Sequence, residues 1–122
     1  MEKIIVIDDE AVVRETITEM LQRAGYEVWA AADGGEGIDL FREKNVDLVI
    51  TDIIMPEVEG IETIRILLQE QPGVKIIAIS GGGRISNDDR LQMAGHFGAS
   101  LTLKKPFERE ELLKAVRTVL DS

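Results

Sequence analysis

The chain has 122 residues, 44% of them hydrophobic, and a formal net charge of −9 at pH 7. This length suits one domain with its own hydrophobic core, and we expect a single domain over residues 1–122. There is no cysteine, which excludes disulfides, thiol catalysis and thiolate metal sites. The negative charge disfavours direct nucleic-acid binding and binding to an anionic membrane, since both would repel the protein.

No stretch of the sequence approaches the roughly 20 apolar residues of a membrane span, and the short apolar run at the N-terminus does not suit a signal peptide. We therefore expect no membrane association and a cytoplasmic location.

Short apolar segments alternate with segments of helical periodicity along the chain. The run KIIVI at residues 3–7 is the first apolar segment, and Gly25 closes the helical segment that follows it. The predicted strands cover residues 3–7, 27–31, 47–51, 75–79 and 100–103. The predicted helices are one with Val13, Ile17, Met20, Leu21 and Ala24 on one face, three over residues 34–43, 60–69 and 88–95, and a last one carrying Leu112, Leu113, Val116, Val119 and Leu120.

Apolar strands separated by helices predict a parallel sheet that is covered on both faces and has right-handed crossovers. We predict an α/β fold with a doubly wound five-stranded parallel sheet of order 2-1-3-4-5 and five helices, as in flavodoxin-like proteins. In such a sheet the C-terminal ends of all strands lie along one edge. Ligands bind at this edge, beside the point where the strand order reverses.

Chemically reactive side chains follow four of the five predicted strands. They are Asp8, Asp9 and Glu10 after the first strand, Asp52 after the third, Ser80 after the fourth, and Lys104 and Lys105 after the fifth. Because neighbouring strands lie about 4.8 Å apart, acids at the ends of the first and third strands would lie within reach of one ion. Clustered carboxylates repel one another, and a hard cation such as Mg²⁺ relieves that repulsion. Taken singly, each acid is equally compatible with a helix N-cap or a polar loop.

Taken together, the acids, the hydroxyl and the lysine are the groups needed to move a phosphoryl group onto a carboxylate. Asp52 would attack phosphorus, and a lysine ammonium would hold a phosphoryl oxygen. Mg²⁺ would neutralise negative charge on the transferring group.

Four sequence motifs resemble those of the receiver domains of bacterial two-component response regulators, including single-domain, CheY-like proteins. They are VIDDE at residues 6–10, LVITDIIMPEVEG at 48–60, IIAIS at 76–80 and LTLKKPF at 101–107. They stand in the family's order and at the predicted strand ends, and the resemblance covers the whole chain.

The resemblance implies a Mg²⁺ site beside a phosphorylated aspartate. Asp52 would be the phospho-acceptor. Asp9, Asp52 and the backbone carbonyl of Ile54 would bind Mg²⁺ directly, and Asp8 would act mainly through a bound water.

The resemblance also implies which groups contact the phosphoryl group. Lys105 would bind it and would precede a cis Pro106, whereas Lys104 would point elsewhere. Ser80 would be the switch hydroxyl that moves to bond a phosphoryl oxygen, and Gly81 occupies a position that must be small for the donor to approach.

The function implied is a phosphorylation-dependent signalling switch. It would accept a phosphoryl group from the phospho-histidine of a sensor histidine kinase or a histidine phosphotransfer protein, and it would act on an unidentified downstream protein. It would catalyse only its own phosphorylation and dephosphorylation, as a monomer or a phosphorylation-dependent homodimer.

Two other interpretations remain open, namely a pseudo-receiver that binds partners without phosphorylation, and a receiver excised from a larger transcriptional regulator or hybrid kinase. A haloacid-dehalogenase-like phosphohydrolase is disfavoured, because it would carry a second acid where this chain has Ile54.

Two features depart from the family pattern. Thr102 lies three residues before Lys105, where most receivers have an aromatic residue whose rotamer reports phosphorylation. The chain is also longer than usual between Ser80 and Lys105, and the three consecutive glycines at residues 81–83 predict a mobile loop beside the site.

Overall fold

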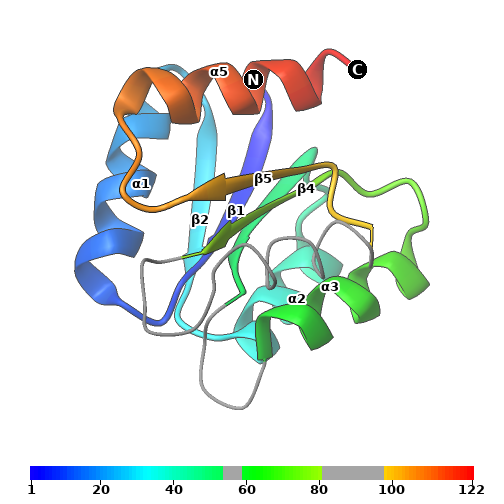
Figure 1. Cartoon of the computed structure of the whole chain (residues 1–122). Helices are drawn as coiled ribbons and strands as arrows, with labels where there is room; N and C mark the ends of the chain where they lie inside the picture. The colour runs from blue at the N-terminus through cyan, green and yellow to red at the C-terminus, as the bar shows by residue number, and fades with distance from the viewer. Residues whose placement is uncertain (54–58, 81–97) are drawn as a thin grey trace.

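The computed structural model describes residues 1–53, 59–80 and 98–122. The strands are β1 (Lys3–Ile7), β2 (Glu27–Ala31), β3 (Leu48–Asp52), β4 (Ile76–Ser80) and β5 (Leu101–Lys104). The described helices are α1 (Ala11–Arg23), α2 (Gly34–Glu43), α3 (Glu59–Glu70) and α5 (Arg109–Leu120). All strand pairs are parallel, and the order is β2-β1-β3-β4-β5 (Figure 1). The predicted sheet and its order are confirmed.

The helices lie close to their predicted positions. The bounds of α2 match the prediction, and α3 begins one residue earlier and ends one residue later than predicted. Gly25 follows the C-cap of α1 with a φ of 98°, a left-handed conformation that favours glycine. The helix predicted at residues 88–95 lies outside the described residues. In the described part of the chain, no helix has both the length and the apolar character needed to cross a membrane.

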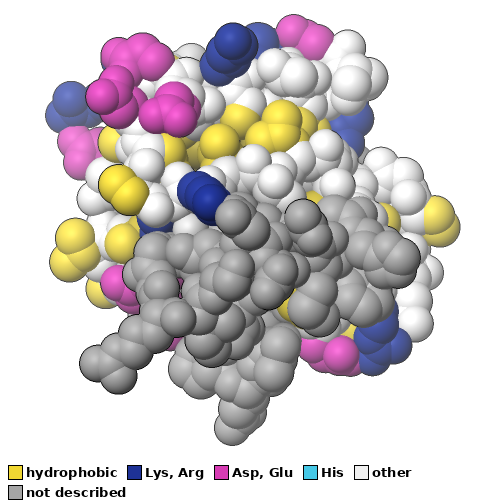
Figure 2. Space-filling view, in the orientation of Figure 1, with side chains coloured by type: hydrophobic (Ala, Val, Ile, Leu, Met, Phe, Trp, Pro, Cys, Tyr) yellow, Lys and Arg dark blue, Asp and Glu magenta, His cyan; other side chains and the backbone are white. Residues whose placement is uncertain are grey.

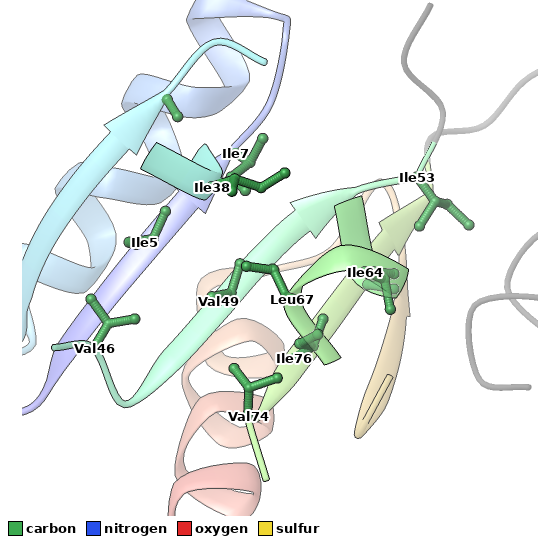
Figure 3. Packing of buried hydrophobic residues seen from close by; sticks show 12 residues of the cluster. Ile5, Ile7, Ile38, Val46, Val49, Ile53, Ile64, Leu67, Val74 and Ile76 are labelled. Atoms are coloured by element: carbon green, nitrogen blue, oxygen red, sulfur yellow. The ribbon is translucent and has the colours of Figure 1, made fainter. Parts of the chain in front are cut away.

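Two hydrophobic clusters cover the two faces of the sheet. Ile5 and Ile7 of β1 pack with α2 and α3, whereas Ile4 and Val6 pack with α1 and α5. Successive side chains of a strand point to opposite faces, so a strand buried on both faces must be apolar at every position. Figure 3 shows the first cluster, in which Ile38 of α2 and Ile64 and Leu67 of α3 lie against the strands. Each such buried side chain contributes about 1.5–3 kcal/mol to folding.

Three strands lie one residue later than predicted. β3, β4 and β5 cover residues 48–52, 76–80 and 101–104, not 47–51, 75–79 and 100–103. The hydrogen-bonded ladder continues past the last apolar residue, because Asp52 pairs with Ile79, and Ser80 pairs with Lys104. Asp52 and Ser80 are therefore the last residues of their strands and not the first residues of loops, and the sheet fixes their backbone.

Candidate functional site

The candidate site lies at the C-terminal ends of β1, β3 and β5, on the edge of the sheet where the strand order reverses. Asp8 directly follows β1, and its amide donates to the carbonyl of Ala31 at 3.1 Å. Lys105 directly follows β5, and its amide donates to the carbonyl of Ser80 at 2.7 Å. Asp52 ends β3 within the ladder itself. Pairing with a neighbouring strand thus fixes the backbone of each of these residues.

The ammonium of Lys105 joins the ends of β1 and β3. Its Nζ lies 2.9 Å from Oδ2 of Asp52 and 3.0 Å from Oδ2 of Asp8. The side chains of both aspartates are 2% exposed, and that of Lys105 is 14% exposed. Burial lowers the pKa of Lys105, but hydrogen bonding and charge attraction from Asp52 and Asp8 outweigh this effect and raise the pKa above its ordinary value of 10.5. Lys105 is therefore a cation at neutral pH.

Four carboxyl groups lie close together at this site. Asp8, Asp9, Glu10 and Asp52 each offer one oxygen, and these oxygens all lie within 4.8 Å of one another. Asp8 and Asp52 are buried, whereas Asp9 and Glu10 are exposed. Glu10 also approaches Lys105, with 3.7 Å between Oε1 and Nζ. The site therefore has an excess of acidic groups over basic ones and is open to water on one side.

The donor set fits Mg²⁺. An octahedral Mg²⁺ has oxygen ligands at about 2.1 Å, so that opposite ligands lie roughly 4.2 Å apart. The carboxylate oxygens of the cluster lie within 4.8 Å of one another, which is a slightly larger spacing. Rotation of the exposed Asp9 and Glu10 side chains can bring their oxygens closer. The open side suits the waters that Mg²⁺ retains.

Asp8 is already occupied by protein donors. Its Oδ1 accepts from the amide of Glu10 at 2.9 Å, while its Oδ2 accepts from Lys105. Its backbone carbonyl accepts from Nη1 of Arg14 at 2.7 Å. A carboxylate held in this way suits an indirect role, through water, better than direct coordination.

The structure brings together four residues predicted from the sequence, which are Asp8, Asp9, Asp52 and Lys105. Ser80 is fully buried at the end of β4, the strand between β3 and β5. The peptide bond between Lys105 and Pro106 is cis, as the resemblance implied. Ile54 and Gly81 lie outside the described residues.

Two residues of the site were missed in the sequence. Glu10 follows the first predicted strand without a predicted role, and Arg14 lies outside the predicted strand ends. A signal for Arg14 was present, because a cation at the end of a helix's first turn is unfavourable in the field of the helix dipole. That turn of α1 contains no acid that would offset it.

Glycines let α2 and α3 approach the site closely. A Cβ on Gly60 of α3 would overlap the carbonyl oxygen of Asp52 and the Cα of Ile53. A Cβ on Gly37 of α2 would overlap the side chain of Ile7, the residue before Asp8. The end of β3 therefore packs against α3 at a distance that only glycine permits, whereas a larger residue at position 37 would require the Ile7 side chain to move.

Residues 4–117 match the family model described as the response regulator receiver domain. The chain belongs to the response regulator receiver family. Response regulator MprA from Mycobacterium sp. (strain KMS) is 35% identical to this receiver over 119 residues, which cover 97% of this chain and 50% of that protein. Sporulation initiation phosphotransferase F from Bacillus subtilis (strain 168) is 29% identical over 119 residues, covering 98% of this chain and 94% of that protein.

Solved receiver structures share the fold of this receiver. The crystal structure of a response regulator receiver domain protein from Clostridium thermocellum matches with a TM-score of 0.90 at 32% identity, covering 99% of this chain and 95% of that one. This receiver spans about half the length of several of the curated relatives that it matches.

Replacing Lys105 by methionine should destabilise this receiver in the absence of divalent cations. The substitution keeps the length of the side chain but leaves the buried carboxyl groups of Asp8 and Asp52 without their cation, which should cost about 3 kcal/mol of unfolding free energy. Urea denaturation at pH 7 with a chelator measures this difference. The double variant Lys105→Met/Asp52→Asn should recover part of the loss, because one of the two carboxylates is then absent.

Lys114→Met is the matched control, since Lys114 is exposed on α5, and its effect should stay within about 0.5 kcal/mol. Equal stability of Lys105→Met and the wild type would show that the ammonium does not hold the two strand ends together.

Proposed function

We propose that this receiver is a phosphorylation-dependent signalling switch that accepts a phosphoryl group on Asp52 in the presence of Mg²⁺. The contact of the Lys105 ammonium with both Asp8 and Asp52, inside a cluster of acids, is the observation that carries the proposal. A carboxylate nucleophile, a cation for the phosphoryl oxygens and oxygen ligands for Mg²⁺ lie together at one strand edge. These are the groups that phosphoryl transfer requires.

In the proposed reaction, a carboxylate oxygen of Asp52 attacks the phosphorus of a phospho-histidine. A P–O bond forms, the P–N bond breaks, and its electron pair remains on the imidazole nitrogen of the donor. Lys105 exchanges its contact with Asp52 for a contact with a phosphoryl oxygen. Mg²⁺, when bound, neutralises charge on the phosphoryl oxygens.

The other predicted site residues would hold Mg²⁺ or respond to the phosphoryl group. Asp9, Asp52 and the backbone carbonyl of Ile54 would hold Mg²⁺, with Asp8 acting through water. Ser80 would supply the hydroxyl that responds to the phosphoryl group; its position at the end of β4, next to β3, supports this role.

An apolar groove beside the site supports docking of a protein donor. A cavity of about 290 Å³ lies between α1 and the segment after β5. It is lined by Val12, Val13, Thr16, Ile17, Met20, Lys105, Pro106 and Phe107. Figure 2 shows hydrophobic side chains on the α1 side of the molecule, and Val12 is 77% exposed. Because Lys105 belongs to both groove and site, a helix seated here would bring its phospho-histidine toward Asp52.

The donor would be a sensor histidine kinase or a histidine phosphotransfer protein, and the phosphorylated form would bind a downstream protein. The receiver would turn over no substrate other than its own phosphoryl group, and it would act as a monomer or a phosphorylation-dependent homodimer. Phosphoryl donors and Mg²⁺ are both abundant in the cytoplasm, where we expect it to act.

Incubation with acetyl phosphate and Mg²⁺ should add one phosphoryl group to the wild-type protein, because a small donor needs no docking surface. Intact-mass measurement should detect the addition, which should be absent from Asp52→Asn and from a reaction with a chelator. Asp39→Asn, on the exposed side of α2, is the control and should be modified like the wild type. Failure of the wild type to be modified would favour a pseudo-receiver.

Val12→Gln should slow transfer from an autophosphorylated histidine kinase that phosphorylates the wild type. Burying a valine contributes about 1.5 kcal/mol, so the rate should fall roughly tenfold if Val12 is covered by the donor. The rate with acetyl phosphate should be unchanged. Equal slowing with both donors would place the effect in the site itself, and no slowing with the kinase would exclude Val12 from the docking surface.

A further inference from the structure

We propose that Arg14 is a positioning residue of the phosphorylation site, which aims Asp8 and Asp9 by holding the peptide bond between them. This inference rests on the proposed function, and it assigns a role to a residue outside the motifs that carry the family resemblance. Arg14 acts through the backbone and touches neither acceptor nor phosphoryl group.

The contact itself is specific. Nη1 of the partly buried Arg14 donates to the carbonyl oxygen of Asp8 at 2.7 Å. That carbonyl belongs to the peptide joining Asp8 to Asp9, so the guanidinium fixes the plane of this peptide. The other side of Asp8 is fixed by the hydrogen bond from its amide to Ala31. With both backbone groups of Asp8 held, the directions of the Asp8 and Asp9 side chains are restricted.

The position of Arg14 has no local explanation in α1. A cation at the end of the first turn is disfavoured by the helix dipole, and the N-cap residue Glu10 makes no side-chain capping bond that would strengthen this end. Arg14 is unfavourable for the helix but contacts the candidate site, so its presence is better explained by the site than by the stability of α1.

Arg14 and Lys105 are both cations, but they contact different groups of the site. Lys105 contacts the carboxylate oxygens of Asp8 and Asp52 directly. The contact of Arg14 with Asp8 is to the backbone carbonyl, and it leaves the carboxylate oxygens of Asp8 and Asp9 to other partners. Arg14 can therefore restrict the backbone beside the acids without competing for metal ligands.

The expected effect is on the affinity for Mg²⁺. Without Arg14 the peptide between Asp8 and Asp9 can rotate, and the oxygen of Asp9 is no longer held near that of Asp52. Residues that orient metal ligands typically contribute about 10-fold or more to affinity. Phosphorylation should be slowed at low Mg²⁺ and should return toward the wild-type rate when Mg²⁺ is saturating.

The test compares Arg14→Ala, Arg14→Lys and Arg23→Ala with the wild type. The Mg²⁺ dissociation constant is measured by calorimetry without any phosphoryl donor, and the acetyl phosphate rate is measured as a function of Mg²⁺. Arg14→Ala should raise the dissociation constant about tenfold. Arg14→Lys should fall between Arg14→Ala and the wild type, because an ammonium can donate to the same carbonyl. Arg23→Ala removes an equal charge from an exposed pair with Glu19 on the same helix and should match the wild type.

The inference is overturned if Arg14→Ala lowers the unfolding temperature but leaves the Mg²⁺ dissociation constant unchanged, which would be a structural role alone. It is also overturned if Arg23→Ala weakens Mg²⁺ binding equally, because the effect of Arg14→Ala would then not come from the contact with the Asp8 carbonyl. If Arg14→Ala does not fold, the Mg²⁺ dissociation constant of Arg14→Lys decides whether the inference holds. Absence of Mg²⁺ binding or Asp52 modification in the wild type would defeat the proposed function and this inference together. If the wild type binds Mg²⁺ and is modified, and the Arg14 variants bind Mg²⁺ equally well, this inference alone is defeated.

Discussion

The site depends on one ammonium placed between two buried carboxylates. Asp8 and Asp52 come from the ends of neighbouring strands, and Lys105 Nζ lies within 3.0 Å of an oxygen of each. Two acids at 2% side-chain exposure would otherwise repel one another in a region that solvates charge poorly. The same juxtaposition that Lys105 makes tolerable is what a phosphoryl group and a divalent cation need. Under the proposed function, the stability of this edge of the sheet and its chemistry would therefore depend on the same contact.

The backbone of the site is rigid, while part of its donor set is adjustable. The sheet ladder holds Asp52, hydrogen bonds to neighbouring strands hold Asp8 and Lys105, and Gly60 lets α3 pack directly on the end of β3. By contrast, Asp9 and Glu10 are exposed. In the proposed function, a frame that fixes Asp52 and Lys105, beside carboxylates that can still rotate, would let one site accommodate a metal ion and a phosphoryl group together.

The sequence predicted the sheet order and the meeting of Asp8, Asp9, Asp52 and Lys105 at one edge, because apolar runs mark strands buried on both faces and the polar residues that end those runs meet at one edge. It misplaced β3, β4 and β5 by one residue, since side-chain polarity at Asp52 and Ser80 ends the apolar pattern while backbone hydrogen bonds continue. For Arg14 the sequence offered only its unfavourable place in the first turn of α1, because no residue pattern encodes its contact with a main-chain carbonyl. Thr102 lies in β5 opposite Ala78, at the position where the resemblance leads one to expect an aromatic residue.

Calorimetric titration of Mg²⁺ into the wild type, Asp9→Asn and Asp52→Asn tests most directly whether the ends of β1 and β3 form one cation site. A single site is expected in the wild type, with affinity reduced about tenfold or more in each variant. Glu110→Gln, on α5, should bind like the wild type. If Asp9→Asn and Asp52→Asn both retained the affinity of the wild type, the two strand ends would not share a metal ion, and the site described here would be contradicted.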